Sequence, residues 1–360
     1  MATINAIVDL QFGSSGKGLL AGYLAKKTKP DTIITAWAPN AGHTFVDKDC
    51  NKMVTCMIPN GIVSGTVDQI LIGPGSVINP ELMMSEIEKY IGVMAYPKIF
   101  IHEHAAVVTE GHRGAESVYG SRIGSTMKGC GEAVIDKIRR ATNGNSNTAK
   151  DMLRGTPLYE CVVSGNKYNE RLYNHAEIIQ IEGAQGYSLG INSGFYPYTT
   201  SRECTIQQLL VDCGIPMQFY NKAKVNIYGA ARTFPIRVSN RYDNDGNMIG
   251  WSGPCYPDQE EITWDEVGVP PEFTTVTKLQ RRVFSFSMQQ IVEACQASDV
   301  DFIFLNFANY MKRTDELDSL IRDIQVETKV PVVLLGFGPK ESDVVERDPS
   351  YMSMVYDGAL

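Results

Sequence analysis

A glycine-rich turn with one lysine, Gly13–Gly18 (GSSGKG), lies near the start of the chain. It follows the apolar segment Ile4–Leu10 and opens a predicted helix. At a strand-to-helix turn of this kind, free backbone N–H groups and the helix dipole point toward a bound anion. Its position therefore predicts a phosphate site, although a glycine-rich turn with one lysine is often only a tight connection.

The spacing of this turn differs from that of a P-loop. A P-loop needs a glycine where this chain has Gln11, and a serine or threonine where it has Gly18. The two serines of the turn, Ser14 and Ser15, therefore need an explanation of their own.

A second polar loop, Ala38–Phe45 (APNAGHTF), follows the next predicted strand. An amide, an unhindered backbone carbonyl, an imidazole and a hydroxyl come from Asn40, Gly42, His43 and Thr44. A lone histidine is usually structural, but polar groups flank this one, and we expect the phosphate loop at the neighbouring strand end. His102 and His104 lack such neighbours and give only a weak metal signal.

Glycines are dense in the segment Ile181–Ser201, where Glu182, Gln185 and Thr200 follow a predicted buried strand. Four glycines suit a close approach of the backbone to a ligand. Structural turns explain the glycines, but they explain Gln185 less easily. The segment therefore predicts a binding loop.

Two more segments combine hydroxyl and basic side chains. In Phe273–Phe286, three threonines precede Lys278, Arg281 and Arg282. Such a loop can hold a carboxylate, and the alternative is a solvated basic face. The segment Gly124–Arg140 joins glycine, serine, threonine and basic residues, which suggests a site for a phosphate monoester.

The apolar pattern predicts the elements that position these motifs. Buried strands are predicted at Ile4–Leu10, Thr32–Trp37, Gln69–Ile72, Lys98–His102, Ile178–Glu182, Lys224–Tyr228, Asp301–Phe307 and Val330–Gly336. Helices are predicted at Pro80–Ile91, Ile206–Gly214, Phe286–Ser298 and Thr314–Thr328. This alternation indicates a mainly parallel α/β sheet flanked by helices, with ligands at the carboxyl ends of its strands. The irregular segment Phe234–Arg282 reads as inserted loops, so we expect a single domain over residues 1–360.

Composition excludes several classes of protein. The 360 residues are 43% hydrophobic and 21% charged, which is typical of a globular protein with a substantial core. A net charge of −8 and a pI near 5.3 argue against binding to long nucleic acids. No apolar run approaches the ~18 residues of a membrane span. The eight cysteines include no CxxC pair, so we expect reduced thiols in a cytoplasm.

Together these motifs resemble the adenylosuccinate synthetase family, from about Val8 to Pro339. The family's G-D-E-G-K-G loop corresponds to Gly13–Gly18. Its N-A-G-H-T, E-G-A-Q-G and Y-P-Y-x-T motifs correspond to Asn40–Thr44, Glu182–Gly186 and Tyr196–Thr200. The stretches Ala231–Val238 and Thr274–Val283 are most similar to the shorter, archaeal-type members. The resemblance implies the family's fold, which is related to that of P-loop proteins, and a carbon–nitrogen ligase that acts as a homodimer.

The resemblance also implies a two-step reaction. A nucleotide γ-phosphate moves to the 6-oxygen of a purine monophosphate, and the amine of L-aspartate then displaces it. His43 would donate to the transferring phosphoryl group, while Lys17 and Mg²⁺ neutralise developing charge. Ser14 and the carbonyl of Gly42 would be the metal ligands.

The remaining site residues are carried over from the family motifs in the same way. The purine monophosphate would be held by Ser14, Asn40, Ser125, Thr126, Gln185, Thr200, Leu279 and Arg140, the last reaching across a dimer. Aspartate would be held by Thr275, Val276, Thr277 and Arg281. The donor nucleotide would be held by Gly13, Ser15, Gly16, Lys17, Gly18, Gly42, His43, Thr44, Asn306, Asn309, Gly338 and Pro339.

Ser14 is the most informative departure from the family pattern. The family has an aspartate here, which takes the N1 proton of IMP, and losing a general base costs roughly 10²–10⁴-fold in rate. A branch encoded by bacteriophages with 2-aminoadenine in their DNA carries serine at this position and acts on dGMP. The shorter side chain leaves room for guanine's 2-amino group and can still accept a hydrogen bond.

Two other departures agree with this branch. Leu279 stands where the family has an arginine near the ribose hydroxyls, which is consistent with a 2′-deoxyribose. Asn306-Phe307-Ala308-Asn309 stands where the family reads guanine with the aspartate of T-K-L-D. An amide both donates to and accepts from adenine, which favours ATP or dATP as phosphoryl donor.

The sequence thus predicts a ligase that joins L-aspartate to dGMP, giving the succinylated precursor of the 2-aminoadenine deoxynucleotide. Two alternatives stay open at this point. One is a conventional adenylosuccinate synthetase that uses IMP and GTP. The other is a catalytically inactive nucleotide-binding protein. All three readings predict small-molecule ligands and neither nucleic acid nor membrane as partner.

Overall fold

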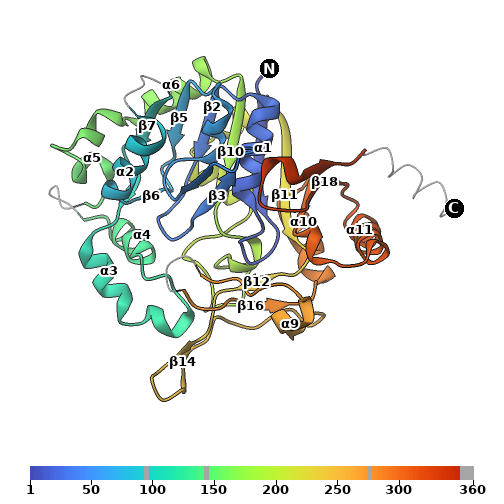
Figure 1. Ribbon diagram of the computed structural model, residues 1–360. Coiled ribbons are helices and arrows are strands. Elements are labelled where there is room, and N and C mark those ends of the chain that lie inside the picture. Colours follow the sequence, from blue (N-terminus) through green and yellow to red (C-terminus); the bar gives the residue numbers. More distant parts are fainter. Residues whose placement is uncertain (93–96, 142–145, 275–277, 349–360) are drawn as a thin grey trace.

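The computed structural model describes residues 1–92, 97–141, 146–274 and 278–348. A ten-stranded sheet runs through it in the order β19-β18-β17-β11-β1-β10-β2-β5-β7-β9 (Figure 1). Its strands are β1 Thr3–Asp9, β2 Thr32–Thr35, β5 Gln69–Ile72, β7 Lys98–His102, β9 Val162–Val163, β10 Ile178–Glu182, β11 Lys224–Arg232, β17 Phe302–Asn306, β18 Val332–Gly336 and β19 Val344–Glu346. All neighbours are parallel except β18 and β19.

All eight predicted strands are confirmed, because a parallel sheet covered on both faces needs continuous apolar runs. Their ends differ by a few residues: β2 stops at Thr35 rather than Trp37, and β11 continues to Arg232 rather than ending at Tyr228. The two edge strands were not predicted. β9 and β19 have only two and three residues, too few to show a periodicity.

Helices cover both faces of the sheet. They are α1 Lys17–Thr28, α2 Pro80–Tyr90, α3 Glu110–Ser117, α4 Cys130–Arg139, α5 Ala149–Met152, α6 Gly165–His175, α7 Ile206–Asp212, α8 Met217–Tyr220, α9 Trp264–Val267, α10 Met288–Ser298 and α11 Thr314–Thr328. The 3₁₀ helices are η1 Asn60–Ser64, η2 Gly120–Ile123, η3 Pro157–Cys161, η4 Tyr187–Leu189, η5 Ala308–Tyr310 and η6 Glu341–Asp343. Successive residues of β1 face opposite sides: Val8 packs in the core beneath α10 and α11, and Ile7 packs in the core beneath α1.

The segment Phe234–Arg282 is more ordered than the sequence predicted. It contributes β12 Ile236–Arg237 and β15 Glu261–Ile262, which flank β16 Arg282–Phe284 in a small sheet, as well as α9. A hairpin of β13 Arg241–Tyr242 and β14 Met248–Gly250 projects from the molecule (Figure 1). Two further pairs are β3 His43–Val46 with β4 Lys52–Thr55, and β6 Val77–Ile78 with β8 Ala106–Val107.

Among the described residues, no helix has both the length and the apolar character that crossing a membrane requires. All eight cysteines lie in this part of the chain and are free thiols.

Candidate functional site

Three of the predicted loops meet at the carboxyl ends of β1, β10 and β2. The order of the sheet corrects one expectation, because β1 and β2 are not neighbours and β10 lies between them. The loop after β10 therefore contacts both others. The Gln185 side-chain nitrogen donates to Asn40 Oδ1 (3.0 Å), and Lys17 Nζ donates to the Gln185 carbonyl.

The Gly13–Gly18 turn has an unusual backbone, with left-handed residues at Gly13 (φ 81°), Ser14 (φ 57°) and Gly16 (φ 90°). Ser14 adopts this conformation without being glycine, which is uncommon and typical of functional sites. A Cβ on Gly16 would lie 2.0 Å from the Asn306 side-chain nitrogen, so this position admits only glycine. Gly16 caps α1, and the free N–H groups of the helix begin there.

Asp9 fixes this turn from within, and the sequence reasoning did not identify it. Its side chain is fully buried and accepts hydrogen bonds from the backbone of Gln11 (3.0 Å), Gly13 (3.1 Å) and Ser15 (3.4 Å). It also pairs with Lys17 (3.0 Å). A carboxylate at the end of an otherwise apolar strand was the available signal, because a buried charge needs a partner.

Lys17 is held in place by these contacts rather than free in solvent. Only 7% of its side chain is exposed, and Asp9 and the Gln185 carbonyl take two of its three donor positions. One N–H of the ammonium group is left for a ligand at the start of α1.

His43 opens β3, which packs against α1 so closely that a Cβ on Gly18 would lie 2.5 Å from the Thr44 carbonyl. His43 is 94% buried, and its Nε2 has no hydrogen-bond partner among the described residues. Burial, and secondarily the charge of Lys17, hold the pKa of His43 well below its usual range. A neutral imidazole beside the first turn of α1 can donate one hydrogen bond to an anion.

Two side chains from strands that are distant in sequence hold the carbonyls of the turn. Arg232, fully buried at the end of β11, donates to the Ser14 carbonyl (3.2 Å). Asn306, at the end of β17, donates to the Ser15 carbonyl (3.3 Å), and its Oδ1 accepts from the Phe307 N–H (2.9 Å). The sequence predicts that Asn306 binds the donor nucleotide, and in the structure its amide also contacts the backbone of the turn. Asn309, in η5, is exposed.

The residues predicted for the purine monophosphate come from several loops. Thr200 lies in the 190–204 loop, where Glu203 accepts from the backbone of Asn192 and Ser193. Ser125 donates to Glu116 (2.7 Å), and Thr126 is next to it in the loop before α4. Arg140 follows α4, is exposed, and donates to the Ile138 carbonyl (3.2 Å).

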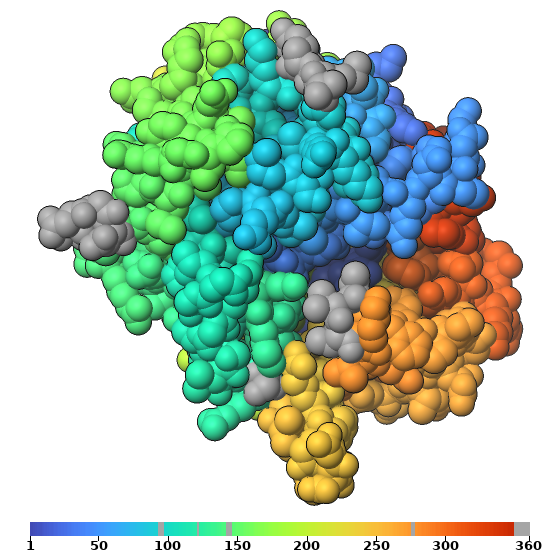
Figure 2. Space-filling model, turned by 60° about the vertical axis from the view of Figure 1, so that its left-hand side comes forward, coloured from blue at the N-terminus to red at the C-terminus, as the bar shows by residue number. Residues whose placement is uncertain are grey.

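The predicted aspartate segment is described only at its two ends; Thr275, Val276 and Thr277 lie outside the described residues. The Thr274 N–H donates to the Leu279 carbonyl (2.9 Å), and the Arg281 N–H donates to the Glu272 carbonyl (2.8 Å). Glu272 is also paired with Arg232. In Figure 2, N-terminal residues in dark blue lie recessed between the blue-green and the orange parts of the surface, which come from distant segments of the chain.

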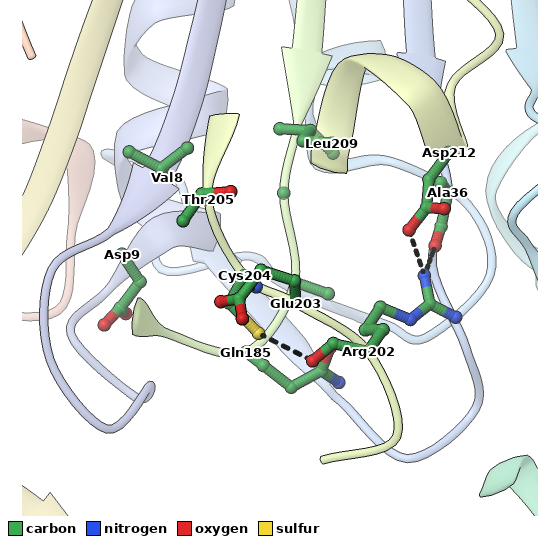
Figure 3. Close-up of a pocket in the computed structure, with 12 residues that line it drawn as sticks. Val8, Asp9, Ala36, Gln185, Arg202, Glu203, Cys204, Thr205, Leu209 and Asp212 are labelled. Atoms are coloured by element: carbon green, nitrogen blue, oxygen red, sulfur yellow. Dashed lines mark hydrogen bonds and ion pairs between the residues drawn. The ribbon is translucent and has the colours of Figure 1, made fainter. Parts of the chain in front are cut away.

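A pocket lies behind the three loops, lined by the ends of β1, β2 and β10 and by the 202–212 segment (Figure 3). Asp9 and Gln185 border it, and Asp9 also accepts a hydrogen bond from Gly13 of the glycine-rich turn. Arg202 donates to the Ala36 carbonyl and pairs with Asp212 (3.5 Å). Burial raises the pKa of the Cys204 thiol to about 12, which makes this cysteine a poor nucleophile.

The oxygen groups predicted to bind a metal are Ser14 and the Gly42 carbonyl, and both residues are exposed. Among the described residues, no group of three or more His, Cys, Asp or Glu side chains could hold an ion. Mg²⁺ prefers oxygen ligands and often keeps several waters while bridging phosphates. A sparse oxygen donor set therefore fits Mg²⁺ that arrives with a nucleotide.

Comparison with known sequences agrees with this geometry. A family model described as adenylosuccinate synthetase matches residues 6–154 and 146–319. The N6-succino-2-amino-2'-deoxyadenylate synthase of Acinetobacter phage SH-Ab 15497 is 45% identical over 96% of this chain and 93% of its own. The enzyme of the same name from Salmonella phage PMBT28 is 44% identical over 94% and 96%. Adenylosuccinate synthetase of Pyrococcus horikoshii is 27% identical over 95% and 97%.

Two solved structures have the same fold. The cyanophage S-2L succinoaminodeoxyadenylate synthetase, bound to dGMP and to dATP as an energy donor, matches over 99% of both chains with a TM-score of 0.89 and 40% identity. The fully ligated adenylosuccinate synthetase of Plasmodium falciparum matches over 96% of this chain and all of its own, with a TM-score of 0.74 and 18% identity. The second likeness shows the fold alone.

Proposed function

The chain belongs to the adenylosuccinate synthetase family, and we propose that it joins L-aspartate to dGMP, with ATP or dATP as phosphoryl donor, to form N6-succino-2-amino-2'-deoxyadenylate. It is thus a carbon–nitrogen ligase that serves the synthesis of DNA containing 2-aminoadenine. The observation that carries the proposal is the match along nearly the whole chain to the cyanophage enzyme that binds dGMP and dATP. Serine at position 14 supports it.

In the first step, the bond between the donor's γ-phosphorus and its bridging oxygen breaks, and a bond to O6 of dGMP forms. The nucleoside diphosphate leaves, and the N1 proton of guanine is released. Lys17 and the free N–H groups at the start of α1 hold the phosphates, and neutral His43 donates from Nε2 to the transferring group. Ser14 and the Gly42 carbonyl would hold Mg²⁺, which would further neutralise the charge of the phosphates.

In the second step, the amine of aspartate attacks C6, phosphate leaves with the electron pair of the C6–O6 bond, and the nitrogen loses a proton. Phosphorylation is required first, because a purine carbonyl oxygen is a poor leaving group. Thr275, Val276, Thr277 and Arg281 hold the aspartate. Arg281 and Lys278 supply the positive charge that its carboxylates need.

Nucleotide specificity comes from side chains around these groups. Asn40, Ser125, Thr126, Gln185 and Thr200 hold dGMP, together with Arg140 from the second subunit of a homodimer. Ser14 leaves room for the 2-amino group of guanine, and the apolar Leu279 accommodates the deoxyribose. Asn309, Gly338 and Pro339 contact the base of the donor, and Asn306 supports the phosphate turn from below.

The whole chain acts as a single unit of this family. The two relatives that are 44% and 45% identical come from phages, so the proposed place of action is the cytoplasm of an infected bacterium.

Release of phosphate tests the proposal. Purified protein is mixed with aspartate, Mg²⁺ and either ATP, dATP or GTP, and then with dGMP, GMP, dIMP or IMP in turn, and the products are identified by mass. We expect phosphate and succinylated nucleotide with dGMP and an adenine donor. Turnover with IMP and GTP only would indicate a conventional adenylosuccinate synthetase, and calorimetric binding without turnover would indicate an inactive protein.

A further inference from the structure

Trp37 lies directly against His43 and directly precedes the polar loop Ala38–Phe45. The two rings are stacked, with 3.8 Å between their centroids and 5° between their planes. Trp37 is 2% exposed. One face of the imidazole is therefore covered by an indole.

The indole is itself fixed at its edge. Trp37 Nε1 donates to the carbonyl of Glu182 at the end of β10 (2.8 Å). Trp37 follows β2. Its hydrogen bond links it to the end of β10, and its stacked ring links it to His43, the first residue of β3. A ring held by both a hydrogen bond and a parallel stack has little freedom to turn.

The stack covers a face of the His43 imidazole and leaves its nitrogen atoms at the uncovered edge. Its Nε2 is buried without a partner in the described part of the chain, although buried polar atoms normally have one. Lys17, on α1, is the charged group that acts on the imidazole, and its own charge is balanced by Asp9. His43 thus lies within the electrostatic influence of Lys17, at the turn where phosphate is expected.

We propose that Trp37 is a positioning residue, whose indole fixes the plane of the His43 imidazole so that Nε2 meets the transferring phosphoryl group. This inference rests on the proposed function. Its physical basis is that hydrogen bonds to a transition state act only within a narrow range of geometry, and a misplacement of about 1 Å can cost ~10²-fold in rate. Stacking removes the rotation of the imidazole that would cause such a misplacement.

Two substitutions separate stacking from mere filling of space. Trp37→Leu keeps an apolar side chain but removes the ring, whereas Trp37→Phe restores a ring face without the indole N–H. We expect Trp37→Leu to lower kcat by about 10²-fold, with the KM values for dGMP and aspartate near those of the wild type. Trp37→Phe should recover most of kcat.

Tyr168→Leu is the matched control. Tyr168 is also an aromatic residue, 1% exposed, whose side chain donates to a backbone carbonyl, that of Cys213, at 2.8 Å. It lies on α6, outside the site, so its loss should reduce stability but leave kcat unchanged. If Trp37→Leu lowers kcat no more than Tyr168→Leu, or if Trp37→Phe recovers nothing, the positioning role is wrong.

The stack can also be observed without turnover. In histidine-labelled protein, the ring protons of His43, identified by their loss in His43→Gln, should be shifted upfield by the indole. The shift should vanish in Trp37→Leu and persist in Trp37→Phe. Unshifted signals in the wild type would overturn the inference while leaving the proposed function intact; a wild type with shifted signals but no phosphate release would overturn the proposed function.

Discussion

The Gly13–Gly18 turn and the segment that follows Glu272 differ in how their residues are held. The turn is fixed from below by side chains that are almost fully buried, namely Asp9, Arg232 and Asn306. At the described ends of the second segment, Lys278 and Leu279 are exposed, and the contacts are mainly between backbone groups. The side of the site that is proposed to hold phosphate is thus preorganised by the core, whereas much of the proposed specificity depends on exposed side chains.

Ser14 combines a backbone that is held by the core with an exposed position. Its carbonyl is held by buried Arg232, but the residue as a whole is exposed. The backbone is fixed by the core, and the side chain is free to differ among relatives without loss of the fold. Substitutions on the buried side should therefore reduce rate or stability, and those on the exposed side should change selectivity.

The largest effect is expected from His43→Ala. Removing the donor to the transferring phosphoryl group should lower the rate of phosphate release by roughly 10²–10⁴-fold. Binding of dGMP, measured by calorimetry, should stay close to that of the wild type, because the proposed contact of His43 is with the donor rather than with the purine. Turnover retained in this variant would show that the role of His43 is wrongly assigned.

Asp9→Asn tests the buried side directly. The amide keeps the shape but removes the charge, which leaves Lys17 buried without a counter-ion. Breaking a buried pair typically costs about 3–5 kcal/mol, and we expect a loss of this order in the free energy of unfolding in urea. The KM for ATP should rise as the turn loosens. The exposed pair Lys27–Glu346 is the control, and Glu346→Gln should change neither quantity measurably. Equal effects in the two variants would contradict the preorganised turn.

Glu182, at the end of β10, is a buried carboxyl group that should make the stability of the protein depend on pH. Burial raises the pKa of its carboxyl to about 7, although hydrogen bonds from Gln180, Gly61 and Asn60 oppose the shift. The unfolded chain has a pKa of about 4.3 here, so the folded state binds the proton more tightly, and stability falls as pH rises from about 4.3 to 7. The free energy of unfolding falls by about 3–4 kcal/mol over this pH range.

The measurement compares the free energy of unfolding of the wild type and Glu182→Gln across this range. Between pH 4.5 and 7, the free energy of unfolding should fall more steeply with pH in the wild type than in Glu182→Gln. Above pH 7.5 the two curves of free energy against pH should run parallel. Parallel curves throughout would show that Glu182 is ionised in the folded protein at every pH tested.

Parts of this arrangement could be predicted from sequence and parts could not, for identifiable reasons. The inner strands were recognisable because strands buried on both faces are continuous apolar runs, and the Gly13–Gly18 turn was recognisable because it follows the first of them. The role of Arg232 was not recognisable from sequence, because Arg232 and Ser14 are 218 residues apart. Only the adjacency of β11 and β1 brings them together. Trp37 was counted within a strand, and its stack on His43 depends on where β2 ends.

On the exposed side, Ser14→Asp should change selectivity. A carboxylate occupies the space proposed for the 2-amino group, so the ratio of kcat/KM for dGMP to that for IMP should fall by about 10–10²-fold. Stability should hardly change, since the side chain is exposed. Ser14→Ala, which keeps the space, is the control and should still prefer dGMP. Unchanged selectivity in Ser14→Asp would remove the steric explanation.

Asn309→Asp is expected to have the smallest effect and compares the two asparagines predicted to read the donor's base. Asn309 is exposed, so its replacement should not disturb the turn. A carboxylate there can accept hydrogen bonds from N1–H and N2–H of guanine. The preference in kcat/KM should therefore shift from ATP toward GTP by about tenfold. Asn306→Asp should instead weaken both donors together, because a carboxylate cannot donate to the Ser15 carbonyl. The opposite result is a shift toward GTP in Asn306→Asp and none in Asn309→Asp. It would show that Asn306 contacts the base of the donor and that its hydrogen bond to Ser15 is not needed to hold the turn.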